Sequence, residues 1–202
     1  MMLAFDTSTA ACTAALFDGD GACLARADET IGRGHAERLV PMIAELMEGR
    51  AATRILVGIG PGSFTGIRVA IAAAHGLAIG WGAELVGFSS LALLAASANG
   101  QGPLAAAVAG GHGELFVQQF DEQLEPTSKL INAPPEEAGR LIDATTVVGS
   151  GARQLVDARG WGEALDLFPS AANALQLPHA LRSLDPKPFY ARAPDARARE
   201  AA

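Results

Sequence analysis

The segment Gly58-Ile59-Gly60-Pro61-Gly62-Ser63-Phe64-Thr65-Gly66-Ile67-Arg68 carries the most specific pattern in the chain. It follows the apolar run Ile55-Leu56-Val57 and opens into an alanine-rich segment, which predicts a strand, a glycine turn and a helix. Gly60 and Gly62 lack a Cβ where the backbone must turn sharply or approach a ligand, and Ser63 can cap the helix. Bare N–H groups of such a turn can bind a phosphate. The spacing lacks the lysine of a phosphate loop, however, and tight packing of helix on strand also explains the glycines.

The helix expected over residues 64–79 has only two charged or titratable side chains, Arg68 and His75. A helix that is apolar nearly all round is typically buried on both sides. One side can pack on its own sheet, and the other needs a second layer, either a neighbouring helix or another protein. Arg68 could pair with an acidic residue of its own domain, but a single arginine on an apolar helix favours contact with a partner protein.

Composition limits the classes of function. The chain has 202 residues, of which 50% are hydrophobic, so it can form one large domain or two small halves with a core. Its formal net charge is −7, with no cluster of Lys or Arg outside the tail, which argues against strong unaided binding to RNA. No apolar run approaches the roughly 20 residues of a membrane span and the first residues predict a strand, so we expect a cytoplasmic protein without signal peptide or anchor. Cys12 and Cys23 are expected to be reduced packing residues.

The same order of elements occurs twice along the chain, as strand, strand, strand, helix, strand, helix. A turn-rich segment at residues 99–103 separates the two copies. This order predicts an α/β fold of duplicated ribonuclease-H-like halves, the actin, sugar-kinase and Hsp70-like (ASKHA) architecture, in which nucleotide sits between the halves. We expect an N-terminal half with the partner-binding helices at 1–99, an abbreviated C-terminal half at 104–184 and a tail at 185–202. The expected strands are 2–8, 11–17, 22–27, 55–57, 84–87, 104–109, 114–121, 127–132 and 145–148, and the expected further helices are 35–48, 89–98, one from 135, 151–159 and 175–184.

The two halves differ at the turn that would hold phosphate. The first half has Asp6, Thr7 and Ser8 there, whereas the second has Ala109-Gly110-Gly111-His112 and no carboxylate. Asp6 could position Mg²⁺ or a water, but one carboxylate without its partner is not a clamp. We therefore favour a structural role in which Asp6 accepts hydrogen bonds from turn amides near Ser8. The vestigial phosphate-loop positions are Asp6, Thr7, Ser8, Gly60, Gly62 and Ser63.

Neither a metal site nor a nucleophile is predicted. The four histidines, His35, His75, His112 and His179, lie far apart, without the H-x-x-x-H spacing of a metal pair. Gly62-Ser63-Phe64 lacks the G-x-S-x-G frame of a serine nucleophile. We expect no catalytic residue and no metal ligand in this chain.

Four segments distributed over the chain carry the motifs of one family. They are Asp6-Thr-Ser-Thr9, His35-Ala-Glu-Arg-Leu-Val-Pro-Met-Ile43, Gly60-Pro-Gly-Ser-Phe-Thr-Gly-Ile-Arg68 and Tyr190-Ala-Arg-Ala-Pro-Asp-Ala196. Together they resemble the bacterial TsaB family. The family's second turn usually reads D-A-R-x-G-E, and here Ala109, Gly110 and Gly111 replace its first three residues.

The resemblance implies a noncatalytic scaffold and activator for tRNA N6-threonylcarbamoyladenosine modification of the adenosine beside the anticodon. It implies pairing with a TsaD-like catalytic subunit, joined by a TsaE-like ATPase, with ATP and metal on those subunits and tRNA reached only through the complex. A homodimer could form when the partner is absent. Tyr190 and Arg192 are expected to dock on the body, and residues 197–202 to be solvated. The alternative is an autonomous ATP-binding enzyme of the ASKHA fold. The expected partner interface comprises His35, Leu39, Met42, Ile43, Gly66, Ile67, Arg68, Ile71 and His75.

Overall fold

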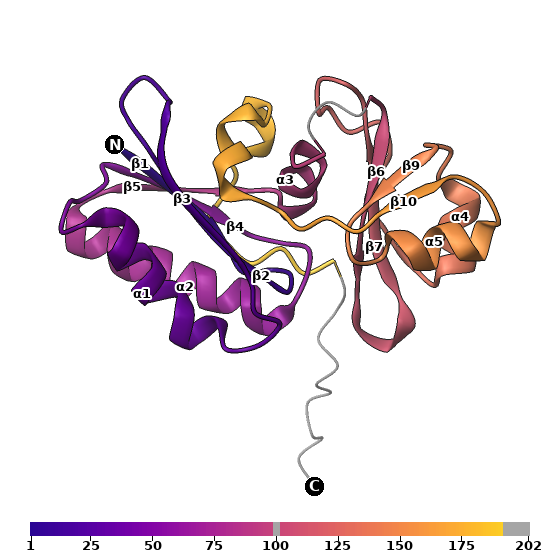
Figure 1. Ribbon diagram of the computed structural model, residues 1–202, viewed down its shortest axis with the longest axis horizontal. Helices are drawn as coiled ribbons and strands as arrows, with labels where there is room; N and C mark the ends of the chain where they lie inside the picture. The colour runs from indigo at the N-terminus through magenta and orange to yellow at the C-terminus, as the bar shows by residue number, and fades with distance from the viewer. Residues whose placement is uncertain (99–101, 192–202) are drawn as a thin grey trace, which may run out of the picture.

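Two five-stranded sheets lie in two lobes of the computed structural model, which describes residues 1–98 and 102–191 (Figure 1). The first sheet has the order β3-β2-β1-β4-β5, and the central strand β1 pairs antiparallel with β2 and parallel with β4. The second sheet has the order β10-β9-β6-β7-β8, with β6 in the same central position. The strands are β1 (Met2–Asp6), β2 (Ala11–Phe17), β3 (Cys23–Thr30), β4 (Arg54–Gly58), β5 (Glu84–Phe88), β6 (Leu104–Ala109), β7 (Leu115–Phe120), β8 (Ile131–Ala133), β9 (Thr146–Val148) and β10 (Glu163–Leu165).

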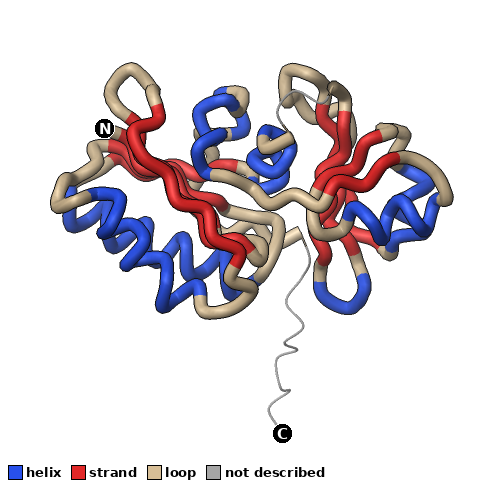
Figure 2. Tube along the Cα trace, viewed as in Figure 1, coloured by secondary structure: helices blue, strands red, loops and turns tan. Residues whose placement is uncertain are grey.

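The repeat predicted from the sequence is present in both lobes, and the fold is a duplicated α/β fold of the ASKHA type. In the first lobe α1 (His35–Met47) follows β3 and α2 (Phe64–Trp81) follows β4, and both helices cover the same face of the sheet (Figure 2). In the second lobe α4 (Pro135–Leu141) and α5 (Ala152–Arg159) take the equivalent places and pack on β6 and β7. The second copy is shorter because its helices are seven and eight residues long, against 13 and 18 in the first.

Each pair of helices covers an apolar cluster on its own sheet, and a further apolar cluster fills the space between the two sheets. Its central elements are α3 (Ser90–Ala96), in which every residue is buried, and the 3-10 turn η2 (Ala171–Gln176). Large side chains from both sheets, such as Phe17 and Phe120, pack against these elements. The two lobes therefore share one core.

After β10 the chain returns to the first lobe. The turn η2 contacts β1, β2 and β3, and further on Leu184 and Gly87 exchange two backbone hydrogen bonds at the edge of β5. Phe189 then donates its N–H to the Ile59 carbonyl at 2.9 Å. The first lobe is consequently built from residues 1–98 together with this C-terminal return, which differs from the continuous ranges expected from the sequence.

Three elements differ from the sequence-based prediction. The expected helix at 175–184 is replaced by η2 and by a second 3-10 turn, η3 (His179–Leu181), because Pro178 between them takes an extended backbone conformation. The expected strand at 127–132 is reduced to β8, and β10 was not expected at all. The boundary at 99–101, Arg192 and the tail at 192–202 lie outside the described residues.

The prediction that one side of α2 packs on its own sheet is confirmed, whereas the second layer expected on its other side, a neighbouring helix or another protein, stays a prediction. Its sheet-facing side is buried and comprises Gly66, Ile67, Ala70, Ile71 and Ala74. The opposite side stays exposed, and Ile79 shows 84% of its surface. Helix α1 lies beside α2 and covers a flank rather than this outer side.

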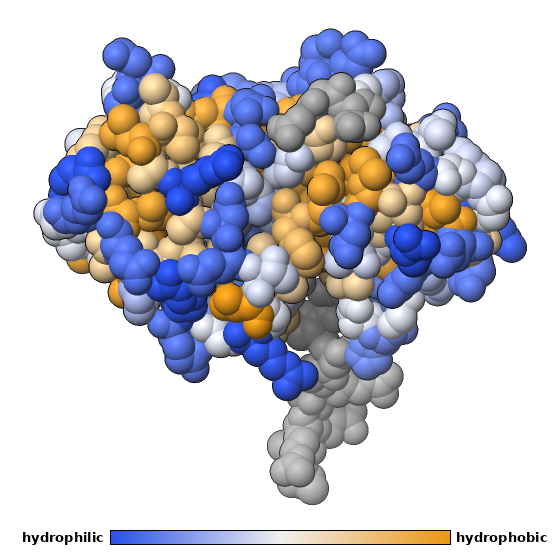
Figure 3. Space-filling model, viewed as in Figure 1, coloured by the Kyte–Doolittle hydropathy of each residue, from blue (hydrophilic) through white to orange (hydrophobic). Residues whose placement is uncertain are grey.

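Helix α2 is an exception to the prediction that no apolar segment is long enough to span a membrane. Its 18 residues, with a mean hydropathy of 1.3, have the length and composition of a membrane-spanning helix, and 28% of them are buried in the protein. Length and composition are shared with the core helices of globular proteins, and α2 packs on β4 and β5. On the face of the molecule that Figure 3 shows, apolar residues form patches divided by hydrophilic residues.

Two neighbouring positions in α2 test this orientation. Ile71 is 7% exposed in the core under the sheet, whereas Ala72 faces solvent. We expect Ile71→Glu to unfold the chain or to lower the free energy of unfolding by about 3 kcal/mol or more, because it buries an unpaired carboxylate. Ala72→Glu should change it by less than about 0.5 kcal/mol. Urea denaturation followed by circular dichroism measures both, and equal effects of the two substitutions would refute the assigned orientation.

Candidate functional site

Gly62, in the loop before α2, and Gly66, in the first turn of α2, are explained by backbone packing against the turn after β1. A Cβ on Gly66 would lie 1.8 Å from the Thr7 carbonyl oxygen, and one on Gly62 would lie 2.2 Å from the Ser8 carbonyl oxygen. The Thr7 hydroxyl donates to the Gly66 carbonyl at 2.7 Å, and the Ser63 N–H donates to the Ser8 carbonyl at 2.7 Å. The packing interpretation of the glycines thus accounts for both positions, while phosphate contact stays a prediction.

Ser63 and Gly60 complete the same loop. The Ser63 hydroxyl accepts from the Gly66 N–H at 3.2 Å and caps α2, as its sequence position indicated. Gly60 has φ 103° and precedes Pro61 in a cis peptide, and a Cβ on it would lie 2.6 Å from the Ile67 side chain. Glycine is the residue that tolerates both this φ and this contact.

Asp6 has the structural role that the sequence favoured. It is fully buried, and one carboxylate oxygen accepts from the Ser8 N–H at 2.6 Å and from the Ser8 hydroxyl at 2.7 Å. The other oxygen accepts from the Ser90 hydroxyl, which itself accepts from the Gly60 N–H at 3.0 Å. Burial raises the pKa of Asp6, and the hydrogen bonds from Ser90 and Ser8 oppose that rise. The carboxylate therefore joins β1, the glycine loop and α3.

Ser90 is a member of this network that the sequence did not reveal. Ser89 caps α3 by accepting from the Ala92 N–H at 3.3 Å, and Ser90 is the first residue of the helix. Ser90 lies 84 residues from Asp6 in the chain. Only the parallel pairing of β4 and β5 brings them together, so no local pattern could have identified the contact.

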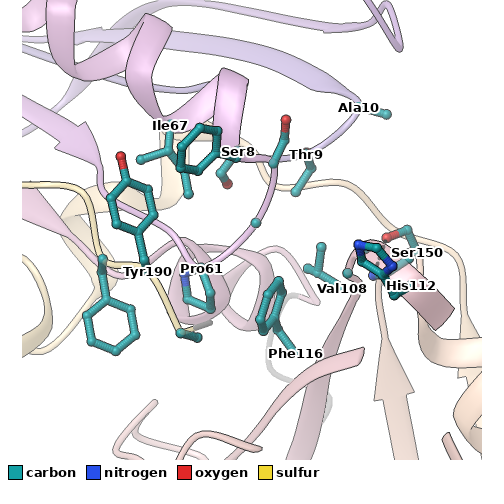
Figure 4. Close-up of a pocket in the computed structure, with 18 residues that line it drawn as sticks. Ser8, Thr9, Ala10, Pro61, Ile67, Val108, His112, Phe116, Ser150 and Tyr190 are labelled. Atoms are coloured by element: carbon teal, nitrogen blue, oxygen red, sulfur yellow. Dashed lines mark hydrogen bonds between the residues drawn. The ribbon is translucent and has the colours of Figure 1, made fainter. Parts of the chain in front are cut away.

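A cleft of about 550 Å³ opens between the lobes beside the glycine loop. Figure 4 shows Ser8 and Thr9 on one wall and Phe116 on the other. Among the described residues, no Lys, Arg, Asp or Glu side chain lines the cleft. The described lining thus offers no Lys or Arg side chain to a polyphosphate. Asp6 is buried and is not among the residues that line the cleft. Its lining residues are Ser8, Thr9, Ala10, Pro61, Gly62, Ser63, Phe64, Ile67, Val108, Ala109, Gly110, Gly111, His112, Phe116, Ser150, Phe189, Tyr190 and Ala191.

The four histidines lie on different elements of the fold. His35 is half-buried at the start of α1, with a buried Nε2 atom that has no hydrogen-bond partner, and His75 is exposed on α2. His112 lines the cleft, and His179 has its Nε2 3.1 Å from the Ser183 hydroxyl. Within residues 1–98 and 102–191, three or more His, Cys, Asp or Glu residues nowhere come together as metal ligands would.

The second candidate site is an exposed surface on the two helices of the first lobe, here called the α1–α2 face. Apolar side chains and glycines dominate it. Two of its residues are large exposed aliphatic side chains, Val40 and Ile79. Its members are Ala36, Val40, Pro41 and Ala44 in α1 and Phe64, Arg68, Ala72, His75, Gly76, Ile79 and Gly80 in α2.

The structure corrects the predicted partner interface. Six of its nine residues pack under the sheet and offer no surface to a partner, because the largest apolar side chains of α1 and α2 are those that fill the protein's own core. Arg68 and His75 are exposed on the α1–α2 face, and His35 is half-buried. The six buried residues are Leu39, Met42, Ile43, Gly66, Ile67 and Ile71.

An aromatic–arginine cluster, formed by Phe64, Arg68 and Tyr190, lies at the N-terminal end of this face. The Arg68 guanidinium carbon is 3.7 Å from the centre of the Phe64 ring, and its Nε donates to the Tyr190 hydroxyl at 3.0 Å. The two rings contact each other with centroids 5.1 Å apart. Tyr190 thus docks on the body, as the sequence led us to expect.

The duplicated lobes and the cleft between them place the protein in the ASKHA class. Residues 28–148 match the family model of TsaD, tRNA N6-adenosine threonylcarbamoyltransferase. A crystal structure of an uncharacterized Pseudomonas aeruginosa protein with similarity to peptidase YEAZ superposes with a TM-score of 0.81 and 31% identity, covering 95% of this chain and 99% of that one.

Two curated relatives are TsaB proteins. The chain is 37% identical over 127 residues to the tRNA threonylcarbamoyladenosine biosynthesis protein TsaB of Escherichia coli, a match that covers 59% of this chain and 54% of the relative. The TsaB of Haemophilus influenzae is 37% identical over 103 residues, covering 48% and 42%. The chain spans about half the length of these curated relatives. It belongs to the TsaB family.

The neighbouring serines of α3 provide a test of the Asp6 network. Ser90→Ala leaves a buried carboxylate oxygen and the Gly60 N–H without their partner, so we expect it to lower the free energy of unfolding by about 2–3 kcal/mol. Ser89→Ala removes only a helix cap and should cost about 1 kcal/mol. Urea titrations at pH 7 compare the two, and an equal cost would mean that the Asp6 contact is energetically unimportant.

The pH dependence of the same variants has a defined sign. Because the pKa of Asp6 is raised in the folded state, its contribution to stability is fully present below its unfolded pKa and declines as pH rises through the folded pKa. Loss of the Ser90 hydrogen bond should raise the folded pKa further. The deficit of Ser90→Ala should therefore grow between acidic and neutral pH, while that of Ser89→Ala stays constant. A pH-independent deficit for Ser90→Ala would contradict this assignment.

Proposed function

We propose that this chain is a noncatalytic scaffold and activator that pairs with a TsaD-like catalytic subunit in tRNA N6-threonylcarbamoyladenosine modification. The observation that carries the proposal is the exposed α1–α2 face. Ile79 alone leaves 84% of its surface in water, and it continues a row formed by Phe64, Arg68 and Ala72 along one side of α2. A row of exposed apolar side chains on one side of a helix supports a protein interface there.

The shape of the face fits a pair of helices from a related subunit. Ala72, Gly76 and Gly80 recur at four-residue spacing, so the backbone of another helix can approach α2 closely. The catalytic subunit is the occupant that we favour, because the chain itself matches the TsaD family model and a related subunit would present a similar helix pair. In the absence of that subunit the same face could bind a second copy of this chain.

The cleft supports a noncatalytic role. Its described lining has no carboxylate to hold Mg²⁺ and no Lys or Arg side chain to bind a polyphosphate, and His112 is the one histidine in it. Both oxygens of Asp6 are engaged within the protein. We accordingly propose that ATP and metal are held by the TsaD-like subunit and by a TsaE-like ATPase. With a net charge of −7, this chain would reach tRNA only through the complex.

A charge placed on the α1–α2 face tests the pairing. We expect Ile79→Glu to keep the wild-type melting temperature and to weaken binding of the TsaD-like subunit by at least about 100-fold, because it places a carboxylate in an apolar contact. Leu141→Glu is the matched control, since Leu141 is 57% exposed on α4 in the other lobe. Isothermal titration calorimetry measures both affinities. Undiminished binding by Ile79→Glu would refute the proposed interface.

Activity of the isolated chain separates the scaffold from an autonomous ATP-using enzyme. We expect no ATP binding by calorimetry and no ATP hydrolysis above background for the chain alone. Threonylcarbamoyl transfer to tRNA should appear only when the TsaD-like and TsaE-like subunits are added. An ATPase of the isolated chain that Asp6→Ala abolishes, in a variant that still melts cooperatively, would favour the enzyme instead.

A further inference from the structure

The Arg68 side chain is held in position by two aromatic residues. Its guanidinium stacks on Phe64 at 3.7 Å, lies 5.8 Å from the centre of the Tyr190 ring and donates from Nε to the Tyr190 hydroxyl. Among the described residues, no Asp or Glu forms an ion pair with it. Arg38, by contrast, is engaged by both Glu29 and Glu45.

The geometry leaves one edge of the guanidinium available. Nε is used by Tyr190, whereas the two terminal nitrogens, which carry four N–H donors, form no hydrogen bond to the described residues. Two parallel N–H groups of this kind match the two oxygens of a carboxylate. Because the aromatic rings already restrict the side chain, binding such a group would cost little further conformational entropy.

We propose that Arg68, held by Phe64 and Tyr190, is the anchor for a carboxylate side chain of the subunit that binds the α1–α2 face. The inference rests on the proposed function and names the chemistry of one contact within it. Arg68 lies one helical turn from Phe64 on one side and from Ala72 on the other, so the cluster is continuous with the apolar row of the face. Arginine and aromatic residues at such a position are typical of interface hot spots.

A partner carboxylate fits the surroundings of Arg68 better than an RNA phosphate. The protein carries 22 acidic against 15 basic residues, and RNA binding requires several cationic side chains acting together. Here the neighbours of Arg68 along α2 are Phe64, Thr65 and Ala72, none of which is charged. A single arginine on an apolar surface is suited to one buried ion pair with a protein.

Tyr190 acts in this contact as a positioning residue. The C-terminal return brings Tyr190 to α2. The hydrogen bond from the Phe189 N–H to the Ile59 carbonyl fixes the backbone directly before Tyr190. The Tyr190 hydroxyl accepts from Nε and leaves the terminal nitrogens without a hydrogen bond to the described residues. The interface would accordingly include the end of the C-terminal return as well as the helices.

The test measures affinity for the TsaD-like subunit by calorimetry at several NaCl concentrations. Arg68→Gln and Arg68→Ala should each weaken binding about 30-fold, the effect of a hot-spot residue, and should flatten its salt dependence. Tyr190→Phe keeps the ring but loses the hydroxyl, and should weaken binding about three- to tenfold. Arg153→Ala, at an exposed arginine on α5, is the matched control and should bind within about twofold of wild type. All variants should melt at the wild-type temperature.

The outcomes separate this inference from the function on which it rests. Loss of binding by Ile79→Glu with unchanged binding by both Arg68 variants would retain the interface and overturn the anchor. Weaker binding with an unchanged salt dependence would show that Arg68 contributes packing alone, which also overturns it. Reduced tRNA affinity of the complex with normal subunit affinity would assign Arg68 to an RNA phosphate. Rescue of Arg68→Glu by an Asp→Arg or Glu→Arg substitution in the partner would identify the paired carboxylate.

Discussion

The close approach of two backbone segments, the turn after β1 and the loop that begins α2, is the constraint on which the rest of the first lobe depends. Carbonyl oxygens of Thr7 and Ser8 lie where the Cβ atoms of Gly66 and Gly62 would be. The buried Asp6 carboxylate holds the same region from behind through Ser8 and Ser90. Together these contacts fix where α2 starts, and therefore which of its sides faces the sheet and which forms the α1–α2 face.

Features that arise from local pattern could be predicted from the sequence. The duplicated order of strands and helices, the cap at Ser63 and the hydrogen bonds from Ser8 to Asp6 all involve residues close in the chain or periodic along it. The role of Ser90 could not be predicted, because it depends on pairing between strands far apart in sequence. The C-terminal return likewise has short 3-10 turns and single bridges in place of a periodic element.

The partner surface shows a further limit of sequence patterns. Hydrophobicity distinguishes water from apolar surroundings, but it does not distinguish the protein's own core from a partner. In α1 and α2 the large residues Leu39, Met42 and Ile67 fill the core. The outer side has mostly small residues, with Val40, Phe64 and Ile79 as its large apolar ones, so its apolar character became clear only once the sheet had taken the other side.

The C-terminal return has a consequence for synthesis on the ribosome. Ala171, Ala174 and Leu177 complete the cluster that covers β1, β2 and α3, although the strands of the first sheet all precede residue 89. An emerging N-terminal segment can therefore form its sheet and the helices α1 and α2 while the part of the opposite face that η2 covers stays open to solvent. That part is sealed only after the whole second lobe has been translated, so the first lobe to begin folding is also the last to be completed.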